Sequence, residues 1–269
     1  MLVNGILTNA EVWYNTKEEH LTTLESADTE LMRILFNAHS KTAIELFFLE
    51  TGKIPLRFII SKRRLLYLWT VLTRGEEELT SKVYQAQKVK RTRNDWYLMI
   101  QEEKIKYDIT LSDEEIANLS KNKFKSYVEK KVNNFALEHL KREAARHSKS
   151  LGILNGVNSL KKWRRQSYLG ENIFSKEELF LLFQLRSRML DVKSNFSTLY
   201  ERNFVCRTCK EEDSIEDEDH LLDCKNLKSE IDDVEVKFDF VYKDLIHQKR
   251  AVNAFKAVLR KREILMKYN

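Results

Sequence analysis

The chain has 269 residues, of which 42% are hydrophobic and 33% charged, with only six Gly and one Pro. Its apolar content excludes a disordered or collagen-like chain, and the scarcity of turn residues favours an all-helical fold of one large or two small domains. The formal net charge of +6 is uneven, since residues 51–100 and 151–200 are basic and both ends are acidic. This distribution suggests a surface that contacts a polyanion, although a solvated charged face is the commoner explanation for any one stretch.

Capping boxes give the clearest helix start signals. In each, a hydroxyl and a carboxylate three residues later satisfy free amides of the first helical turn. We interpret four pairs with this spacing as helix starts, at Thr16–Glu19, Thr42–Glu45, Ser112–Glu115 and Ser175–Glu178. They predict helices over 17–36, from about 43 to Gly52, over 113–119 and over 176–190, with a longer helix over 121–147.

A further helix is predicted to begin at Pro55 and to end before Gly75. Proline suits the first turn because its missing N–H would be unpaired there. Apolar side chains cover nearly every side of this helix at 100° per residue. We therefore expect it to be the buried centre of the first domain. The glycines at 152 and 156 mark the best candidate for a linker.

All three cysteines fall close to a histidine, in the pattern Cys206-x2-Cys209-x10-His220-x3-Cys224. Three thiolates and one imidazole are a donor set that zinc prefers in a tetrahedral site. The alternative is a set of incidental buried cysteines. Four filled positions leave no place for a substrate or water, so we expect a structural Zn that stabilises a segment too small to bury its own core.

The segment between the metal ligands is strongly acidic, with seven Asp or Glu residues among positions 211–219. Together with a thiolate-rich metal site, this segment would repel a phosphate backbone. The zinc knuckle is therefore expected to be a scaffold or a protein-contact element.

Polyanion contact is more plausible in three basic stretches that contain aromatic residues. Cationic groups would engage phosphates while exposed rings stack on unpaired bases. Alternatively, the aromatic residues anchor the core and the charges only solvate the helices. The candidate nucleic-acid-binding residues are Arg57, Lys62, Arg63, Arg64, Lys88, Lys90, Arg91, Arg93, Lys161, Lys162, Trp163, Arg164, Arg165 and Tyr168.

Arg57 and Arg64 are seven residues apart and lie on one side of the Pro55 helix. A buried arginine is rarely left unpaired. Each therefore either pairs with Glu45 or Glu50, or contacts a template or primer phosphate.

Several of these motifs resemble a known family. The run from Leu49 through Gly52 and Pro55 to Leu68 resembles the thumb of non-long-terminal-repeat retrotransposon reverse transcriptases of the restriction-like-endonuclease lineage. The run from Asn4 to Tyr14 is similar to the passage from palm to thumb in that family. The run from Phe183 to Met189, followed by the Cys-Cys-His-Cys cluster, resembles the family's linker region and zinc knuckle.

The resemblance implies a domain order along the chain. It comprises the end of a palm-like segment at 1–15, a helical thumb-like domain at 16–150, a basic helical linker region at 151–200, a zinc knuckle at 201–228 and a C-terminal helical tail at 229–269. Polymerase activity needs paired metal-binding aspartates, normally in an aromatic-x-Asp-Asp turn. No such turn occurs, and the only Asp-Asp pair, Asp232-Asp233, lacks that context. We therefore expect no enzymatic activity and no catalytic residue.

The leading hypothesis is a retrotransposon-derived fragment that binds RNA or DNA through basic helices, with an upstream palm or another element-encoded protein as a possible partner. The alternatives are a zinc-stapled protein-interaction module and a non-functional remnant. Neither a membrane nor a small-molecule substrate is expected. The chain has no apolar stretch of roughly 18–20 residues and no signal-peptide pattern. We therefore expect an intracellular protein, in the nucleus or the cytoplasm.

Overall fold

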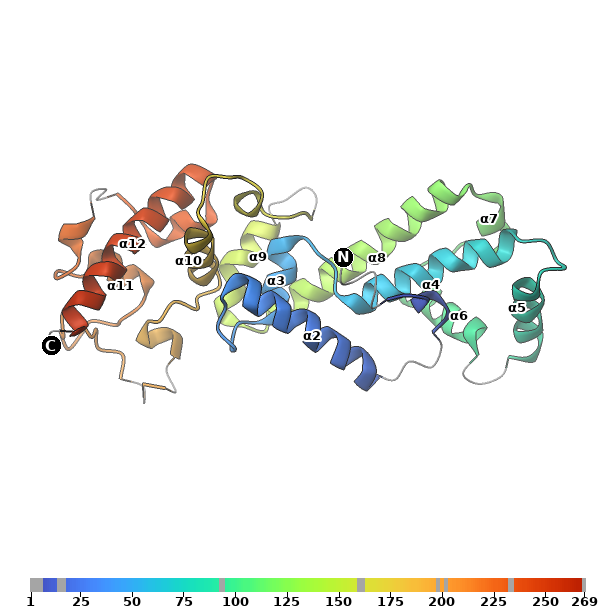
Figure 1. Ribbon diagram of the computed structural model, residues 1–269, viewed down its shortest axis with the longest axis horizontal. Coiled ribbons are helices and arrows are strands. Elements are labelled where there is room, and N and C mark those ends of the chain that lie inside the picture. Colours follow the sequence, from blue (N-terminus) through green and yellow to red (C-terminus); the bar gives the residue numbers. More distant parts are fainter. Residues whose placement is uncertain are drawn as a thin grey trace. The chain divides into compact units, whose positions relative to one another are not determined.

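The computed structural model describes residues 7–13, 18–91, 95–158, 163–196, 199–200, 203–231 and 235–267. These residues form eleven α-helices and no strand, which confirms the predicted all-α fold (Figure 1). The α-helices are α2 (Glu18–Phe36), α3 (Ile44–Thr51), α4 (Leu56–Thr73), α5 (Leu79–Lys90), α6 (Trp96–Lys106), α7 (Asp113–Asn118), α8 (Lys121–Ala144), α9 (Leu151–Asn158), α10 (Lys176–Arg186), α11 (Glu218–Asp223) and α12 (Leu245–Lys267). Short 3-10 helices are η1 (Ala10–Val12), η2 (Ser148–Ser150), η3 (Ser167–Leu169), η4 (Lys193–Phe196), η5 (Lys228–Glu230) and η6 (Phe238–Tyr242).

The chain forms two compact units, each built from two segments. The first unit comprises Met1–Glu30 and Ile54–Leu140, and the second comprises Leu31–Lys53 and Lys141–Asn269. These boundaries differ from the domain order implied by the resemblance. Residues 31–53, placed there in the thumb-like domain, belong to the second unit.

Helix α4 is the centre of the first unit, as its apolar surface predicts. It packs against η1, α5, α6 and α7. Its side chains Phe58, Ile60, Leu65 and Leu68 are almost completely buried. Pro55 occupies the N-cap, one residue before the predicted first-turn position.

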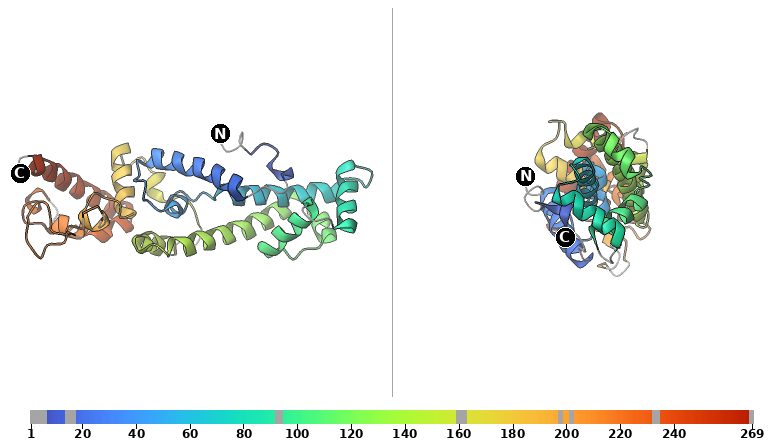
Figure 2. Two further views of the ribbon diagram at one scale, coloured as in Figure 1. Left: turned by 90° about the horizontal axis from the view of Figure 1, so that it is seen from below. Right: turned by 90° about the vertical axis from the view of Figure 1, so that its right-hand side faces the viewer.

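The second unit has one large apolar core that joins the Cys-Cys-His-Cys segment to helices before and after it in the sequence. Leu182 of α10, Leu221 of α11 and Phe255 of α12 are fully buried in this core. Helix α12, red in Figure 2, packs on α10, α11, η5 and η6. The predicted C-terminal tail is therefore part of a core and not an appendage.

The predicted linker at Gly152 and Gly156 is wrong. These glycines lie in α9, which packs on α3 and η6 within the second unit. A Cβ atom at Gly152 would lie 2.1 Å from the ring of Tyr242. Gly152 therefore serves close packing and not chain flexibility.

Most of the predicted helix starts and ends in the described residues agree with the structure. Ser112 and Ser175 form complete capping boxes with Glu115 and Glu178. The Thr42 box does not form, because Ala43 takes the N-cap and the buried Thr42 hydroxyl has no partner among the described residues. Gly52 ends α3 as predicted, while Thr16 lies outside the described residues.

Gly52 has a left-handed backbone conformation that favours glycine and a close backbone contact that leaves no room for a side chain. Its φ is 66°, and an added Cβ would lie 2.4 Å from the backbone of both Arg164 and Arg165. Gly52→Ala should therefore lower the free energy of unfolding by roughly 1–3 kcal/mol, measured by urea denaturation. Gly75→Ala is the control, because a Cβ there meets nothing within 4 Å. Equal midpoints for the two variants would show that the close approach at Gly52 is not needed.

Candidate metal centre

The first two cysteines lie in a tight turn. An antiparallel bridge between Val205 and Ile215 closes the loop that contains them. The N–H of Cys206 donates to the carbonyl of Ser214 at 3.0 Å, and the N–H of Thr208 donates to Cys206 Sγ at 3.4 Å. These bonds fix the loop and direct Cys206 and Cys209 toward the same point.

The other two ligand-type residues come from the short helix α11. Asp217 caps this helix by accepting a 2.7 Å hydrogen bond from the N–H of His220. The C-cap of α11 is Cys224, one helical turn after His220. Asn226 then donates a 3.0 Å hydrogen bond to the carbonyl of Thr208, which joins the two halves of the segment.

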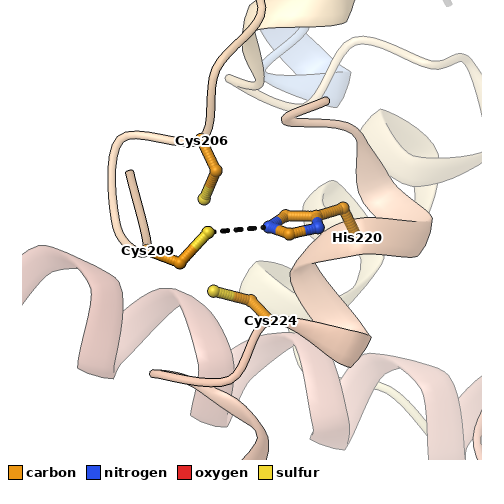
Figure 3. A group of neighbouring side chains, drawn as sticks. All are labelled: Cys206, Cys209, His220 and Cys224. Atoms are coloured by element: carbon orange, nitrogen blue, oxygen red, sulfur yellow. Dashed lines mark hydrogen bonds between the residues drawn. The ribbon is translucent and has the colours of Figure 1, made fainter. Parts of the chain in front are cut away.

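Figure 3 shows the four side chains converging, the two knuckle cysteines from the loop and His220 and Cys224 from α11 and its end. Their ligand atoms all lie within 4.8 Å of one another. Cys209 Sγ is 3.5 Å from His220 Nε2, and all three cysteines are free thiols. This cluster can hold a metal ion, which confirms that the predicted residues come together.

The pKa values of Cys209 and Cys224 are shifted in opposite directions. At Cys209, burial opposes ionisation, but hydrogen bonds that include those with Ser214 and His220 outweigh it and lower the pKa to about 7. At Cys224, burial raises the pKa to about 12, and repulsion from the other two sulfurs adds to it. A cation among the sulfurs would stabilise the thiolates and remove this repulsion.

A buried ion-pair network connects the loop between Cys209 and His220 to helix α12. Glu216 is fully buried and accepts hydrogen bonds from Arg207 Nε at 2.9 Å and Arg262 Nη2 at 3.0 Å. Arg207 also donates to Tyr200 at 2.8 Å. Because Arg262 belongs to α12, this network fixes the loop between the ligand pairs onto the C-terminal helix.

A second buried acid in the same loop is also paired. Glu218 is 1% exposed and accepts from Arg188 at 2.9 Å and from Asn195 at 2.7 Å. The seven acidic residues therefore do not form one solvated negative surface, because Glu216 and Glu218 are neutralised inside the unit. Glu212 and Asp213 remain exposed.

The predicted nucleic-acid-binding arginines of α4 are engaged within the first unit. Arg57 bonds Glu25 at 2.8 Å, and its pKa is raised, chiefly by this hydrogen bond. Arg64 is buried and pairs with Glu103 at 3.1 Å. The partners predicted for these arginines, Glu45 and Glu50, were wrong. Both guanidinium groups are paired with other acids, and that of Arg64 is also buried, whereas the Arg57 side chain is 31% exposed.

Some of the neighbouring basic residues of the first unit have partners within the fold, and others are exposed. Arg63 donates to the carbonyl of Leu7, and Lys62 lies 3.7 Å from Glu129. Lys88 pairs with Asp113 at 2.9 Å. Lys90 and Arg91 are exposed at the end of α5.

Tyr168 cannot stack on a base, because its ring is fully buried and lies over the guanidinium of Arg186. Its selection as a nucleic-acid-binding residue is therefore wrong, and the alternative, a core anchor, is what the structure shows. Arg186 in turn forms a buried ion pair with Glu50 at 2.8 Å. Trp163 is half-buried.

Arg164 and Arg165, by contrast, are exposed on a fixed segment. The next residue, Gln166, donates its N–H to the carbonyl of Glu50 at 2.9 Å. Their backbone also lies directly against Gly52 at the end of α3. Arg93, Lys161, Lys162, Asp232 and Asp233 lie outside the described residues.

Sequence reasoning missed two sets of residues. Arg188, Arg207 and Arg262 neutralise the buried acids, and no local motif signals this, because the pairs are 30, 9 and 46 positions apart in the sequence. The first half of α8 also exposes four lysines, Lys121, Lys123, Lys125 and Lys130. Their alternation with buried Phe124 and Val128 could have indicated a basic helix face.

Among the described residues, no helix combines the length and the apolar composition needed to cross a bilayer. Comparisons with known proteins assign the chain to no family. No family model matches it, and neither a curated protein nor a solved structure is significantly similar to it.

Proposed function

We propose that this chain binds RNA or DNA through an exposed basic surface on a helical fold whose second unit is stabilised by structural zinc. The surface, here called the arginine ridge, consists of Lys53, Arg164 and Arg165. The observation that supports the proposal is that these three basic side chains are exposed on backbone held in place by α3.

Zinc is the metal that the donor set favours. Bonds of about 2.3 Å to sulfur and 2.0–2.1 Å to nitrogen in a tetrahedron place an S and an N ligand about 3.5 Å apart. The Cys209 Sγ to His220 Nε2 distance of 3.5 Å agrees with that value. With four protein ligands the ion has no open position, so its contribution is stabilisation and not catalysis.

The arginine ridge suits a phosphate backbone because its cationic side chains are exposed and are not paired with acidic residues in the described part of the chain. In the described part of the chain, no ion pair involves Lys53, Arg164 or Arg165, whereas Arg57, Arg64 and Lys88 all have carboxylate partners. Guanidinium groups bind phosphate oxygens in a bidentate geometry. Fixing the backbone beforehand lowers the entropy lost on binding.

The resemblance to the thumb, linker and zinc knuckle of a retrotransposon reverse transcriptase supports the same proposal. An all-helical fold followed by a Cys-Cys-His-Cys cluster is what that resemblance implies. In this role the chain would grip a template or primer and would not polymerise by itself, because it contains no aromatic-x-Asp-Asp motif.

Charge reversal at the ridge tests the proposal. We expect the double variant Arg164→Glu with Arg165→Glu to bind single-stranded RNA at least tenfold more weakly in fluorescence anisotropy titrations. The slope of log K against log salt should also fall by about 1.4, because each lost phosphate contact removes about 0.7.

The matched control reverses two exposed lysines elsewhere, Lys82 and Lys267, with the same change in net charge. This control should keep most of the affinity and the native salt slope. If both double variants lose affinity equally, the net charge and not the arginine ridge governs binding. Unchanged affinity in the ridge variant would also contradict the assignment.

A further inference from the structure

A polar pocket of about 320 Å³ lies within the second unit, and its lining includes none of the four candidate metal ligands and no residue of the arginine ridge. The chain segments around α3, η2 and α10 form its walls. Its polar lining residues are Lys41, Arg146, His147, Lys149, Ser150, Ser187 and Asn195. The volume is enough for a small anion and part of the group that carries it.

The charged side chains that line the pocket are all cationic, and the acids next to them are Glu143, which pairs with Arg146, and Glu218, which accepts a hydrogen bond from Asn195. Three lining residues, Lys41, Arg146 and Lys149, are cationic, and none of the described lining residues is acidic. Lys149 donates to the carbonyl of Asn195, which orients its ammonium group without neutralising it. Arg146 donates a hydrogen bond to Glu143 through Nη1. Its other guanidinium N–H groups remain as possible donors to a ligand. The pocket therefore attracts anions.

Ser150 gives an independent indication of a ligand. The residue is fully buried, it lines the pocket, and its hydroxyl has no hydrogen-bond partner among the described residues. A buried hydroxyl without a partner is unfavourable, because the group has lost its hydrogen bonds to water. By contrast, the hydroxyl of Ser187 in the same wall is satisfied by the carbonyl of Phe183 at 2.8 Å. An anionic oxygen in the pocket would supply the acceptor that Ser150 lacks.

We propose that this pocket binds a phosphate group, with the cations of Lys41, Arg146 and Lys149 balancing its charge and Ser150 donating a hydrogen bond. Several cations and a neutral donor around one pocket suit a dianionic tetrahedral group better than a single carboxylate. The proposal is independent of nucleic-acid binding at the arginine ridge, because it predicts affinity for free phosphate.

Titration of the whole, zinc-loaded protein with inorganic phosphate tests the site, with binding followed by isothermal calorimetry. We expect saturable binding by about 10 mM phosphate. Ser150→Ala should weaken that binding at least tenfold, because the variant lacks the hydroxyl that donates a hydrogen bond to the charged group. Lys41→Gln changes an exposed side chain that the fold does not need, and we expect a loss of about threefold.

Lys267→Gln is the control, since this exposed lysine of α12 removes the same charge far along the chain. Its phosphate affinity should equal that of the native protein. Absence of saturable binding to the native protein, or equal affinity in the Ser150→Ala, Lys41→Gln and Lys267→Gln variants, would overturn the proposal. Circular dichroism of each variant shows whether the fold is intact.

The same assay distinguishes the sources of the phosphate. A 5′-phosphorylated oligonucleotide that binds more tightly than its 5′-hydroxyl counterpart, with the difference lost in Ser150→Ala, identifies a nucleic-acid end as the source. Stronger competition by a mononucleotide than by the phosphorylated oligonucleotide identifies a free nucleotide. Either result, with the ridge variant Arg164→Glu/Arg165→Glu unchanged in phosphate affinity, separates this site from the arginine ridge.

Discussion

Replacing Cys224 by Ser is expected to abolish stoichiometric zinc binding and to unfold the metal-binding segment. Cys224 and Cys206 are buried in the core that also contains Leu221 and Phe255. Structural zinc contributes roughly 10–16 kcal/mol in small zinc-binding peptides, so loss of one ligand removes a large share of the stability of this segment. Zinc content by atomic emission and urea unfolding followed by circular dichroism would measure the two effects.

Asp223→Asn is the matched control for that substitution. Asp223 is the neighbouring residue and is exposed, with a weak 3.5 Å contact to Lys228. We expect its zinc content and unfolding midpoint to stay near the native values. A Cys224→Ser protein that unfolds at the native midpoint would show that the cysteines are incidental core residues and not a structural metal site.

Removing the buried carboxylate of Glu216 is the second change with a large expected effect. Glu216→Ala removes the buried carboxylate that Arg207 and Arg262 share and leaves them only the largely exposed carboxylate of Asp191 in common. Breaking a buried pair by removing one partner costs about 3–5 kcal/mol. The unfolding midpoint in urea should fall accordingly.

Glu212→Ala provides the comparison, because it removes the same charge from the same loop at an exposed position. It should change the free energy of unfolding by less than about 0.5 kcal/mol. If the two alanine variants prove equally stable, the network around Glu216 is not what fixes the loop to α12.

The features that the sequence predicted correctly are local in the chain. The capping boxes at Ser112 and Ser175 and the left-handed Gly52 each depend on residues within about one turn, and the Cys-Cys-His-Cys residues all fall between positions 206 and 224. Thr42 shows the limit of this reasoning. Its spacing to Glu45 fits a capping box, yet Ala43 takes the N-cap and the Thr42 hydroxyl is buried.

The features that the sequence could not supply are pairings between distant residues. Arg186 and Glu50 are 136 positions apart, and Arg262 and Glu216 are 46 apart. A basic or acidic run does not reveal which of its charges will be buried and paired. This explains why the sequence left phosphate contact open for Arg57 and Arg64, and why it did not indicate that Glu216 and Glu218 of the acidic loop are buried and paired.

Tyr168 illustrates the same difficulty for aromatic residues. An aromatic residue next to a basic run fits both base stacking and core packing, and only burial distinguishes them. The full burial of Tyr168 over Arg186 anchors η3, while the Arg164-Arg165 segment before it stays exposed. The sequence indicated a basic stretch around Arg164 and Arg165. The packing determines that these two arginines are exposed while Tyr168 is buried.

The affinity of the native, zinc-loaded chain for single-stranded RNA across a salt series tests nucleic-acid binding most directly. With three phosphate contacts from the arginine ridge, log K should fall linearly with log salt at a slope of about −2. A dissociation constant weaker than about 100 μM at low salt, or an affinity that does not change with salt, would contradict the proposal and favour a protein-interaction module.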